Sequence, residues 1–194
     1  LRLANLLCLS HNFSVDLYVE RVIRHAKLVV VRLLGGRSYW PYGVDQIVAT
    51  CRDHSIPLAL VPGDDRPDPE LTALSSLPTA DVNRFWHYLA HGGAANAAGF
   101  LRFAAARLGL EIDWPEPAPI LRAGFYARGG TVSALGDVRK DWREGAPVAA
   151  VLFYRALVQA SDTQAIDALV DALRDAGLNA LPIYVVSLKD PVAA

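Results

Sequence analysis

Apolar residues in the first third of the chain fall into short runs that alternate with segments of helical spacing. A short apolar run between turn signals is typical of a buried strand, and a repeat at i, i+3, i+4 and i+7 is typical of an amphipathic helix. The predicted strands are residues 1–9, 27–34 and 57–61, and the predicted helices are residues 14–25 and 44–54. Strands and helices in alternation assemble into a parallel sheet through right-handed crossovers. We therefore predict an α/β fold with a parallel doubly wound, Rossmann- or flavodoxin-like sheet in three layers.

The pattern changes after the third predicted strand. Two helices are expected in succession, at residues 79–92 and 97–108, and three prolines within residues 114–119 exclude regular structure there. A second strand–helix–strand pattern then spans residues 148–186. Because two strands alone make a poor sheet, we expect this second unit to continue beyond residue 194.

These changes divide the chain into three predicted parts. They are an amino-terminal α/β domain with added helices at residues 1–113, a Pro/Gly-rich connector at residues 114–147, and the start of a second, truncated α/β domain at residues 148–194. The chain begins with Leu1 and contains no methionine, so we expect it to be a fragment of a longer protein.

A loop rich in aromatic residues follows the second predicted strand. Residues 35–43 read GGRSYWPYG, whereas a loop between a buried strand and a helix is usually short and polar. Open α/β sheets bind ligands at the loops that follow their strands. The rings either stack on a planar ligand or plug a domain junction, and the sequence leaves both interpretations open. The candidate substrate-binding residues in this loop are Arg37, Tyr39, Trp40 and Tyr42.

Arg37 is the most specific of these candidates. An arginine among exposed rings offers a bidentate donor to a carboxylate. Arg155, which follows the predicted strand at residues 148–154, is a further candidate for substrate binding on the same grounds.

Two other predicted loops carry residues with possible chemistry. His11 is the candidate catalytic residue, as a proton carrier or a metal ligand, although a single histidine in a loop is also an ordinary turn residue. Asp64 and Asp65 can bind a cation, but two aspartates after Pro-Gly are equally typical of a turn. No residue spacing predicts a metal site built by the protein.

Composition and charge narrow the class of protein. The chain has 194 residues, 53% of them hydrophobic, and a net charge of −1. Near-neutral charge without a basic face argues against nucleic acid as a partner. No apolar run reaches the length of a membrane span, and no signal peptide is recognisable. The two cysteines, Cys8 and Cys51, have no metal-binding spacing, which favours reduced thiols and a cytoplasmic protein.

Several catalytic signatures are missing from the sequence. It contains neither the glycine-rich dinucleotide fingerprint nor a P-loop, so intrinsic ATPase activity is not expected. It also contains no HExxH motif and no nucleophile elbow. The residues alone therefore predict a ligand-binding α/β module.

Three stretches together resemble a known family. They are SHNFSVDLY at residues 10–18, LLGGRSYWPYG at residues 33–43 and LVPGDD at residues 60–65. These are similar to the amino-terminal region of the cobaltochelatase large subunit of the CobN type, which is related to the magnesium chelatase H subunit. Residues 118–126, 148–155 and 162–190 also resemble that family in order and spacing.

The resemblance implies an ATP-dependent metal chelatase. In such an enzyme, the large subunit binds a corrinoid or porphyrin and the metal, while separate AAA+ ATPase subunits hydrolyse ATP. For the cobalt type it implies cobalt as the metal substrate and hydrogenobyrinic acid a,c-diamide as the tetrapyrrole, on the aerobic route to cobalamin. His11 is this chain's candidate for taking pyrrole protons or passing on the metal. We expect the fragment by itself to be inactive.

Two alternatives stay open. One is a magnesium chelatase H-type subunit acting on protoporphyrin IX. The other belongs to a different class, a scaffold or partner-docking domain that never touches substrate and whose aromatic loop only fills a junction.

Overall fold

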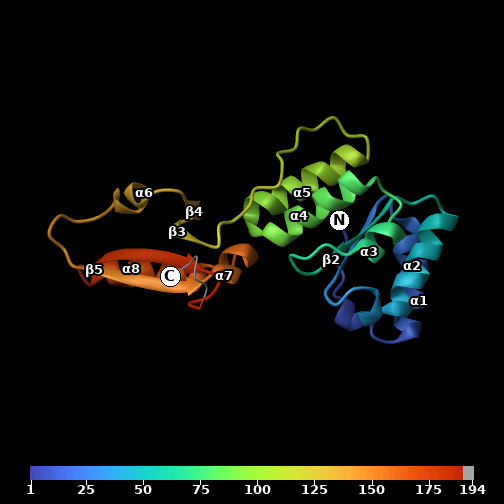
Figure 1. The fold of residues 1–194 in the computed structure, drawn as a ribbon, viewed down its shortest axis with the longest axis horizontal. Helices are drawn as coiled ribbons and strands as arrows, with labels where there is room; N and C mark the ends of the chain where they lie inside the picture. Colours follow the sequence, from blue (N-terminus) through green and yellow to red (C-terminus); the bar gives the residue numbers. More distant parts are fainter. Residues whose placement is uncertain (190–194) are drawn as a thin grey trace. The chain divides into compact units, whose positions relative to one another are not determined.

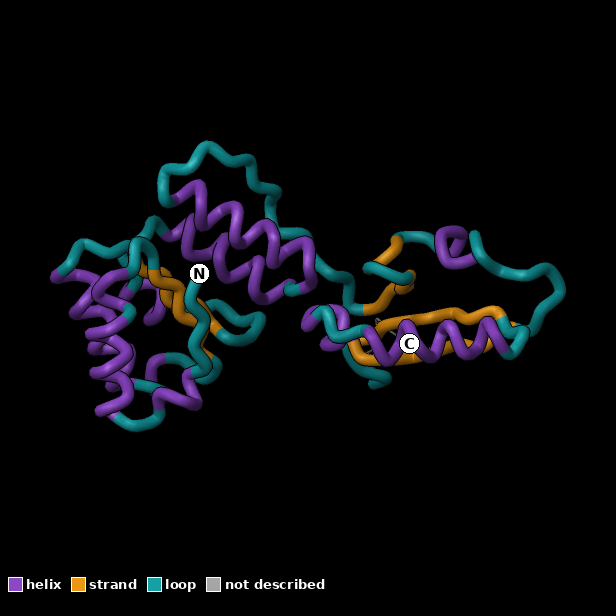
Figure 2. The backbone as a smooth tube through the Cα atoms, turned by 180° about the vertical axis from the view of Figure 1, so that it is seen from behind, coloured by secondary structure: helices purple, strands orange, loops and turns teal. Residues whose placement is uncertain are grey.

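The computed structural model describes residues 1–189 in two units, each with its own sheet (Figures 1 and 2). The first unit comprises Leu1–Ala90 and Ala98–Pro117, and the second comprises His91–Ala97 and the chain from Ala118 onward. The last five residues of the predicted second domain, 190–194, lie outside the described part of the chain.

The first unit is built on two parallel strands. Its pairing runs from Val29 opposite Leu58 to Leu33 opposite Pro62, which confirms the strands predicted at residues 27–34 and 57–61. From residue 1 to residue 107, the helices and strands in chain order are η1 (Leu6–Leu9), α1 (Asn12–Arg21), η2 (Ile23–His25), β1 (Val29–Leu33), η3 (Arg37–Tyr39), α2 (Pro41–Asp53), β2 (Leu58–Pro62), α3 (Pro69–Leu74), α4 (Thr79–His91) and α5 (Gly93–Arg107).

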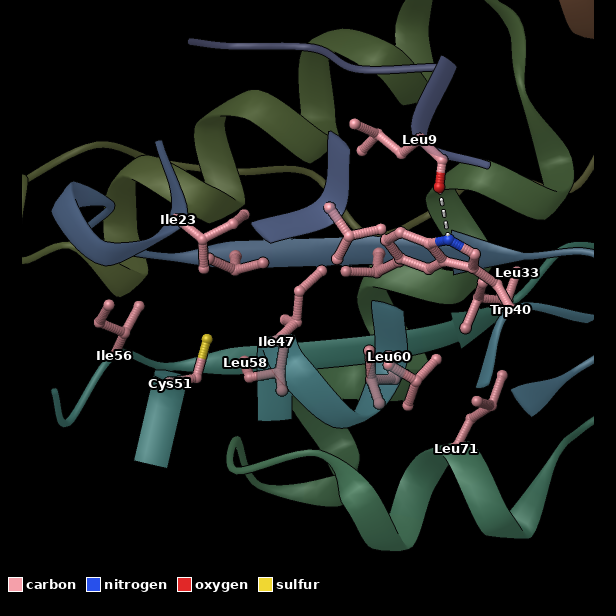
Figure 3. Close-up of a cluster of buried hydrophobic side chains, with 14 residues drawn as sticks. Leu9, Ile23, Leu33, Trp40, Ile47, Cys51, Ile56, Leu58, Leu60 and Leu71 are labelled. Carbon is pink, nitrogen blue, oxygen red and sulfur yellow. Dashed lines mark hydrogen bonds between the residues drawn. The ribbon is translucent and has the colours of Figure 1, made fainter. Parts of the chain in front are cut away.

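Helices cover both faces of β2, and all five of its residues are buried. Leu58 and Leu60 pack with side chains of α1 and α2 (Figure 3), while Ala59 and Val61 pack with side chains of α4 and α5. Alternate residues of a strand point to opposite faces, so each face of this strand joins a separate hydrophobic cluster. An apolar strand without polar alternation is typical of a sheet buried on both sides.

The strand predicted at residues 1–9 does not form. Leu6–Leu9 is a 3₁₀ helix, and the Asn5 side chain accepts a 3.0 Å hydrogen bond from the N–H of Leu7 at its start. Such local side-chain bonds offer the backbone an alternative to a sheet ladder. The first sheet therefore has two strands. The α/β class is confirmed, but the described residues show no doubly wound, Rossmann- or flavodoxin-like sheet.

The second unit contains a mixed four-stranded sheet in the order β4-β3-β6-β5. β5 and β6 are parallel and flank α8, which confirms the predicted strand–helix–strand pattern, while β3 pairs antiparallel with both β4 and β6. The elements are β3 (Ala123–Ala127), β4 (Gly130–Val132), α6 (Leu135–Arg139), β5 (Val148–Tyr154), α7 (Arg155–Ala160), α8 (Gln164–Asp175) and β6 (Asn179–Val185).

The β3–β4 hairpin and α6 lie within residues 114–147, where a connector was predicted. The hairpin turn holds Gly129 at φ +96°, a conformation that favours glycine. Tyr126 of β3 is buried and packs edge-on against Phe153 of β5 with ring centroids 5.7 Å apart. The hairpin thus contributes to the core of the second unit.

Candidate functional site

The aromatic loop, residues 35–43, leaves the carboxyl end of β1 through two glycines. Gly35 and Gly36 have φ of +93° and +69°, in the left-handed region that glycine enters without strain. The loop continues as η3, and Pro41 then begins α2 in the first-turn position where the missing N–H of proline is tolerated. Helix α2 therefore starts inside the aromatic loop, at Pro41 rather than at residue 44.

Trp40 points into the core of the first unit (Figure 3). Its side chain is buried, and the indole Nε1 donates a 2.9 Å hydrogen bond to the backbone oxygen of Leu9. A Cβ added at Gly43, three residues further along, would lie 2.0 Å from the indole Cε2. Stacking on a ligand and plugging a junction were both open for this ring, and in the structure it anchors the loop between η1 and α2.

The Arg37 guanidinium is held between two carboxylates. Its Nη2 lies 2.8 Å from Asp45 Oδ1 on α2, and its Nη1 lies 3.4 Å from Glu70 Oε1 on α3. The hydrogen bond to Asp45, and then that to Glu70, raise the pKa of Arg37 above its usual value. The two carboxylates fix the position of the guanidinium, and the side chain, which is 41% exposed, holds it at the surface of the loop.

The two tyrosines of the loop differ in their surroundings. Tyr39 is 58% exposed, and a Cβ added at Gly35 would lie 3.3 Å from the Tyr39 Cβ. Tyr42 donates a 2.7 Å hydrogen bond from its hydroxyl to Asp16 Oδ1 on α1, and this bond raises the pKa of Tyr42. Tyr39 therefore offers a ring to solvent, whereas Tyr42 ties the start of α2 to α1.

His11 stands at the amino end of α1. Its backbone oxygen accepts hydrogen bonds from the N–H groups of Ser14 and Val15, at 2.9 and 3.1 Å, while its side chain makes no capping bond and is exposed. The predicted helix start at Ser14 is therefore two residues late, because the helix begins at Asn12.

The Asp64–Asp65 segment forms a turn. Asp64 Oδ1 accepts a 3.1 Å hydrogen bond from the N–H of Arg66, and the Asp64 backbone oxygen accepts one from Trp86 Nε1 at 2.9 Å. These hydrogen bonds support the interpretation of the two aspartates as turn residues. Across residues 1–189, no three histidine, cysteine or acidic side chains gather as metal ligands would, and no helix is long and apolar enough to cross a membrane.

Two contacts tie the aromatic loop to neighbouring segments of the first unit. The bond from Trp40 to Leu9 links it to the end of η1, and the ion pair of Arg37 with Glu70 links it to the segment after β2. That segment contains α3, which the sequence interpretation missed. Its signal was present as Asp68-Pro69-Glu70, because Asp68 caps the helix by accepting from Leu71 N–H and proline occupies the first turn.

Arg155 lies in the second unit, as the first residue of α7. Its Nη1 donates a 3.1 Å hydrogen bond to the backbone oxygen of Ile120. This contact fixes the segment that leads into β3. Among the predicted site residues, the structure brings Arg37, Tyr39 and Tyr42 together on one loop, turns Trp40 inward, and places Arg155 in the other unit.

Comparison with known proteins supplies the family. Residues 86–194 match the CobN/Magnesium Chelatase family. The aerobic cobaltochelatase subunit CobN of Pseudomonas aeruginosa is 46% identical over 191 residues, which cover 98% of this chain and 15% of that protein. The aerobic cobaltochelatase subunit CobN of Sinorhizobium sp is 45% identical over 202 residues, covering all of this chain and 16% of that protein.

A solved structure agrees with these relatives. The catalytic subunit of cobaltochelatase from Mycobacterium tuberculosis superposes with a TM-score of 0.72 at 30% identity, covering 91% of this chain and 14% of that subunit. The chain thus spans about 15% of the length of the proteins it matches. It belongs to the CobN/magnesium chelatase family, as the three resembling stretches of the sequence indicated.

Proposed function

We propose that this chain is the amino-terminal part of the large, tetrapyrrole-binding subunit of an ATP-dependent cobaltochelatase. The complete enzyme inserts cobalt into hydrogenobyrinic acid a,c-diamide in aerobic cobalamin biosynthesis. The observation that carries this proposal is the 46% identity to an aerobic cobaltochelatase subunit CobN along 98% of the chain. The likeness to a solved cobaltochelatase catalytic subunit supports it independently in three dimensions.

Within that enzyme, the aromatic loop contributes to tetrapyrrole binding through its exposed residues. Arg37 supplies donors for a carboxylate or amide at the edge of the macrocycle, because a guanidinium has five N–H groups and the 3.4 Å contact with Glu70 is long and replaceable. Tyr39 supplies an exposed ring for stacking. Trp40 and Tyr42 hold the loop in its conformation through their hydrogen bonds to Leu9 and Asp16.

His11 and Arg155 have further proposed roles. His11 takes a pyrrole proton or passes on the cobalt ion, since its imidazole is exposed and the residue follows Leu9, to which Trp40 bonds, by two positions. Arg155 acts as a second donor to the substrate's side groups. ATP is hydrolysed by AAA+ partner subunits, which agrees with the lack of a P-loop in this sequence.

Two rival functions have specific support. The matching family also includes magnesium chelatases, which favours protoporphyrin IX and magnesium as the other substrate pair. The inward position of Trp40 favours a scaffold domain, because a buried indole contributes to stability and not to ligand contact.

A fluorescence titration of the complete subunit tests the proposal. Hydrogenobyrinic acid a,c-diamide and protoporphyrin IX are titrated separately while tryptophan quenching is followed. The wild type is compared with Arg37→Ala, Tyr39→Ala and Trp40→Phe. We expect tighter binding of the corrinoid, and we expect Arg37→Ala and Tyr39→Ala to weaken it about tenfold or more, as for loss of an interface anchor.

The matched control is Leu110→Ala, which removes an equally exposed side chain outside the aromatic loop. It should leave the affinity unchanged. Tighter binding of protoporphyrin IX would move the assignment to the magnesium type. Unchanged corrinoid affinity in both Arg37→Ala and Tyr39→Ala, with lower thermal stability in Trp40→Phe, would make this part of the subunit a scaffold.

A further inference from the structure

The two outer edges of the β1–β2 sheet differ in how their backbone groups are hydrogen-bonded. On the β2 side, the N–H groups of Leu58 and Leu60 donate to the hydroxyls of Ser76 and Ser75, both at 2.8 Å. The N–H of Ser76 in turn donates to the Leu58 oxygen at 2.9 Å. Serine side chains and backbone therefore close this edge, so that no further strand can pair there.

The β1 side has no such closure. The N–H of Val29 donates to Pro57 O and the oxygen of Leu33 accepts from Gly63 N–H, so Val29, Val31 and Leu33 direct their backbone groups toward β2. In a parallel ladder the intervening residues, Val30 and Arg32, face the other way. Within residues 1–189, no protein group bonds the backbone N–H or oxygen of either residue.

A hollow of about 760 Å³ runs along this open edge. Lys27–Arg32 line it along the length of the strand, and Leu89 and apolar residues of α5, among them Phe100 and Leu101, line it as well. Leu1–Ala4 and side chains of α1 and η2 also belong to the lining. Val30 is half-buried, so its unpaired polar groups lie beside apolar walls. Unpaired backbone groups in such surroundings carry a free-energy cost that a partner strand removes.

We propose that the outer edge of β1 is the docking site of an apolar β-strand from the part of the complete subunit outside these 194 residues. The strand adds parallel to β1, its backbone bonds the N–H and oxygen groups of Val30 and Arg32, and its side chains fill the hollow.

Three observations favour this occupant over others. The two unpaired residues are separated by one residue, which is the period of a strand and not of a helix. The matched relatives are six to seven times as long as this chain, so the complete subunit has ample sequence to supply the strand. The lining is mostly apolar, although Arg2, Arg21 and His25 belong to it, and this favours a strand that is largely apolar on both faces, as in a parallel sheet. A small molecule would leave the ladder positions unsatisfied.

Hydrogen exchange on the complete subunit tests the backbone pairing at single-amide resolution. We expect the amides of Val30 and Arg32 to exchange at least a hundredfold more slowly than in an unstructured peptide. The Val31 amide, bonded to β2, is the internal control for an intact β1. Exchange of Val30 and Arg32 within tenfold of the unstructured rate overturns the proposal, whether or not Val31 is protected. No substrate is present, so this outcome is independent of the tetrapyrrole titration.

Cross-linking identifies the occupant. A photoreactive amino acid at Leu101, which lines the hollow and is 47% exposed, is activated in the complete subunit at low concentration. We expect a cross-linked peptide from the same polypeptide outside residues 1–194. The same group at Leu110, which does not line the hollow, is the control. A cross-link to a second copy, to another polypeptide, or only to residues 1–194 of the same chain overturns the proposed occupant.

Discussion

The two parallel strand pairs of this chain, β1–β2 and β5–β6, come from similar sequences and end in different surroundings. β2 is buried at every position. In β5 every second residue is exposed, and three large side chains, Val148, Leu152 and Tyr154, are more than half accessible. Both strands are continuous apolar runs in the sequence.

The difference lies in the helices that cover each pair. β2 receives α1 and α2 on one face and α4 and α5 on the other. On β5, the buried Phe153 packs with α7 and α8 through Val158 and Ile166, while the opposite face, with Leu152, has no comparable cluster among the described residues. An apolar run thus predicts a strand, but the covering of its two faces depends on elements that are distant in the sequence.

The largest expected effect is a difference in the free energy of unfolding between two leucine variants, one in each strand. Leu60→Ala in β2 should destabilise the chain by about 2–5 kcal/mol, since it opens a cavity in a fully buried core. Leu152→Ala in β5 should cost below about 1 kcal/mol, since the side chain is 53% exposed. Urea unfolding followed by circular dichroism measures both. Equal costs would show that the outer face of β5 is covered in solution.

Alkaline pH should weaken the first unit before the second. Burial raises the pKa of Cys51, on the β1–β2 side of α2, to about 11 from 9.0. The neutral thiol is favoured in the folded state, so this contribution is complete below pH 9 and is lost as the pH rises toward 11, up to about 2–3 kcal/mol. Burial also raises the pKa of Tyr126 and Tyr184 in the second unit, whose contribution is lost only above pH 10.

Urea midpoints at pH 8, 9 and 10 check this expectation. Cys51→Ala should flatten the decline between pH 9 and 10, and Cys8→Ala, at the exposed cysteine, should not. An unchanged decline in Cys51→Ala would assign the alkaline loss to other groups.

Two helical glycines give the next contrast. Gly43→Ala in α2 should destabilise the chain by about 1–3 kcal/mol, because the new Cβ would overlap the Trp40 ring. Gly136→Ala in α6 meets open space and should stabilise it by about 0.5–1 kcal/mol, because alanine favours a helix over glycine. Thermal melts measure the two shifts. A neutral Gly43→Ala would show that the Trp40 ring can move aside to admit the new Cβ.

The smallest effect concerns the closed edge of β2. Ser76→Ala leaves the N–H of Leu58 without its acceptor and should cost about 1 kcal/mol. Ser38→Ala is the control, since its hydroxyl bonds the Gly35 oxygen at 3.2 Å in an exposed loop. Hydrogen exchange at the Leu58 amide should accelerate only in Ser76→Ala. Equal acceleration in both variants would mean that the serine does not protect this edge.

The sequence predicted those helices and strands whose apolar pattern depends only on residues within the element. β5 was predicted with its observed bounds, and β1, β2 and α2 within a few residues, because each is a continuous or periodic set of apolar positions. Residues 1–9 are equally apolar, but the Asn5 cap decided in favour of a 3₁₀ helix. The short helices α3 and α7 were missed because they begin directly at turn residues or at a strand end.

The same limit applies to the candidate site. The glycines and rings of residues 35–43 identified an unusual loop, but the direction of each ring depends on distant partners. Trp40 turns inward because Leu9, thirty-one residues earlier, offers a carbonyl oxygen. Arg37 is fixed by Glu70, which lies in a helix that was not predicted. Residue types could be predicted from the sequence, and their orientations could not.

The contact between the Trp40 indole and Gly43 has a consequence for how this loop can change. The ring occupies the volume that a Cβ at position 43 would need, so the two positions share a single space. A larger residue at 43 becomes acceptable only when residue 40 shrinks, and the ring at 40 requires glycine at 43. Substitutions at these positions should therefore be paired, and a combinatorial library covering both should return compensating pairs rather than independent single changes.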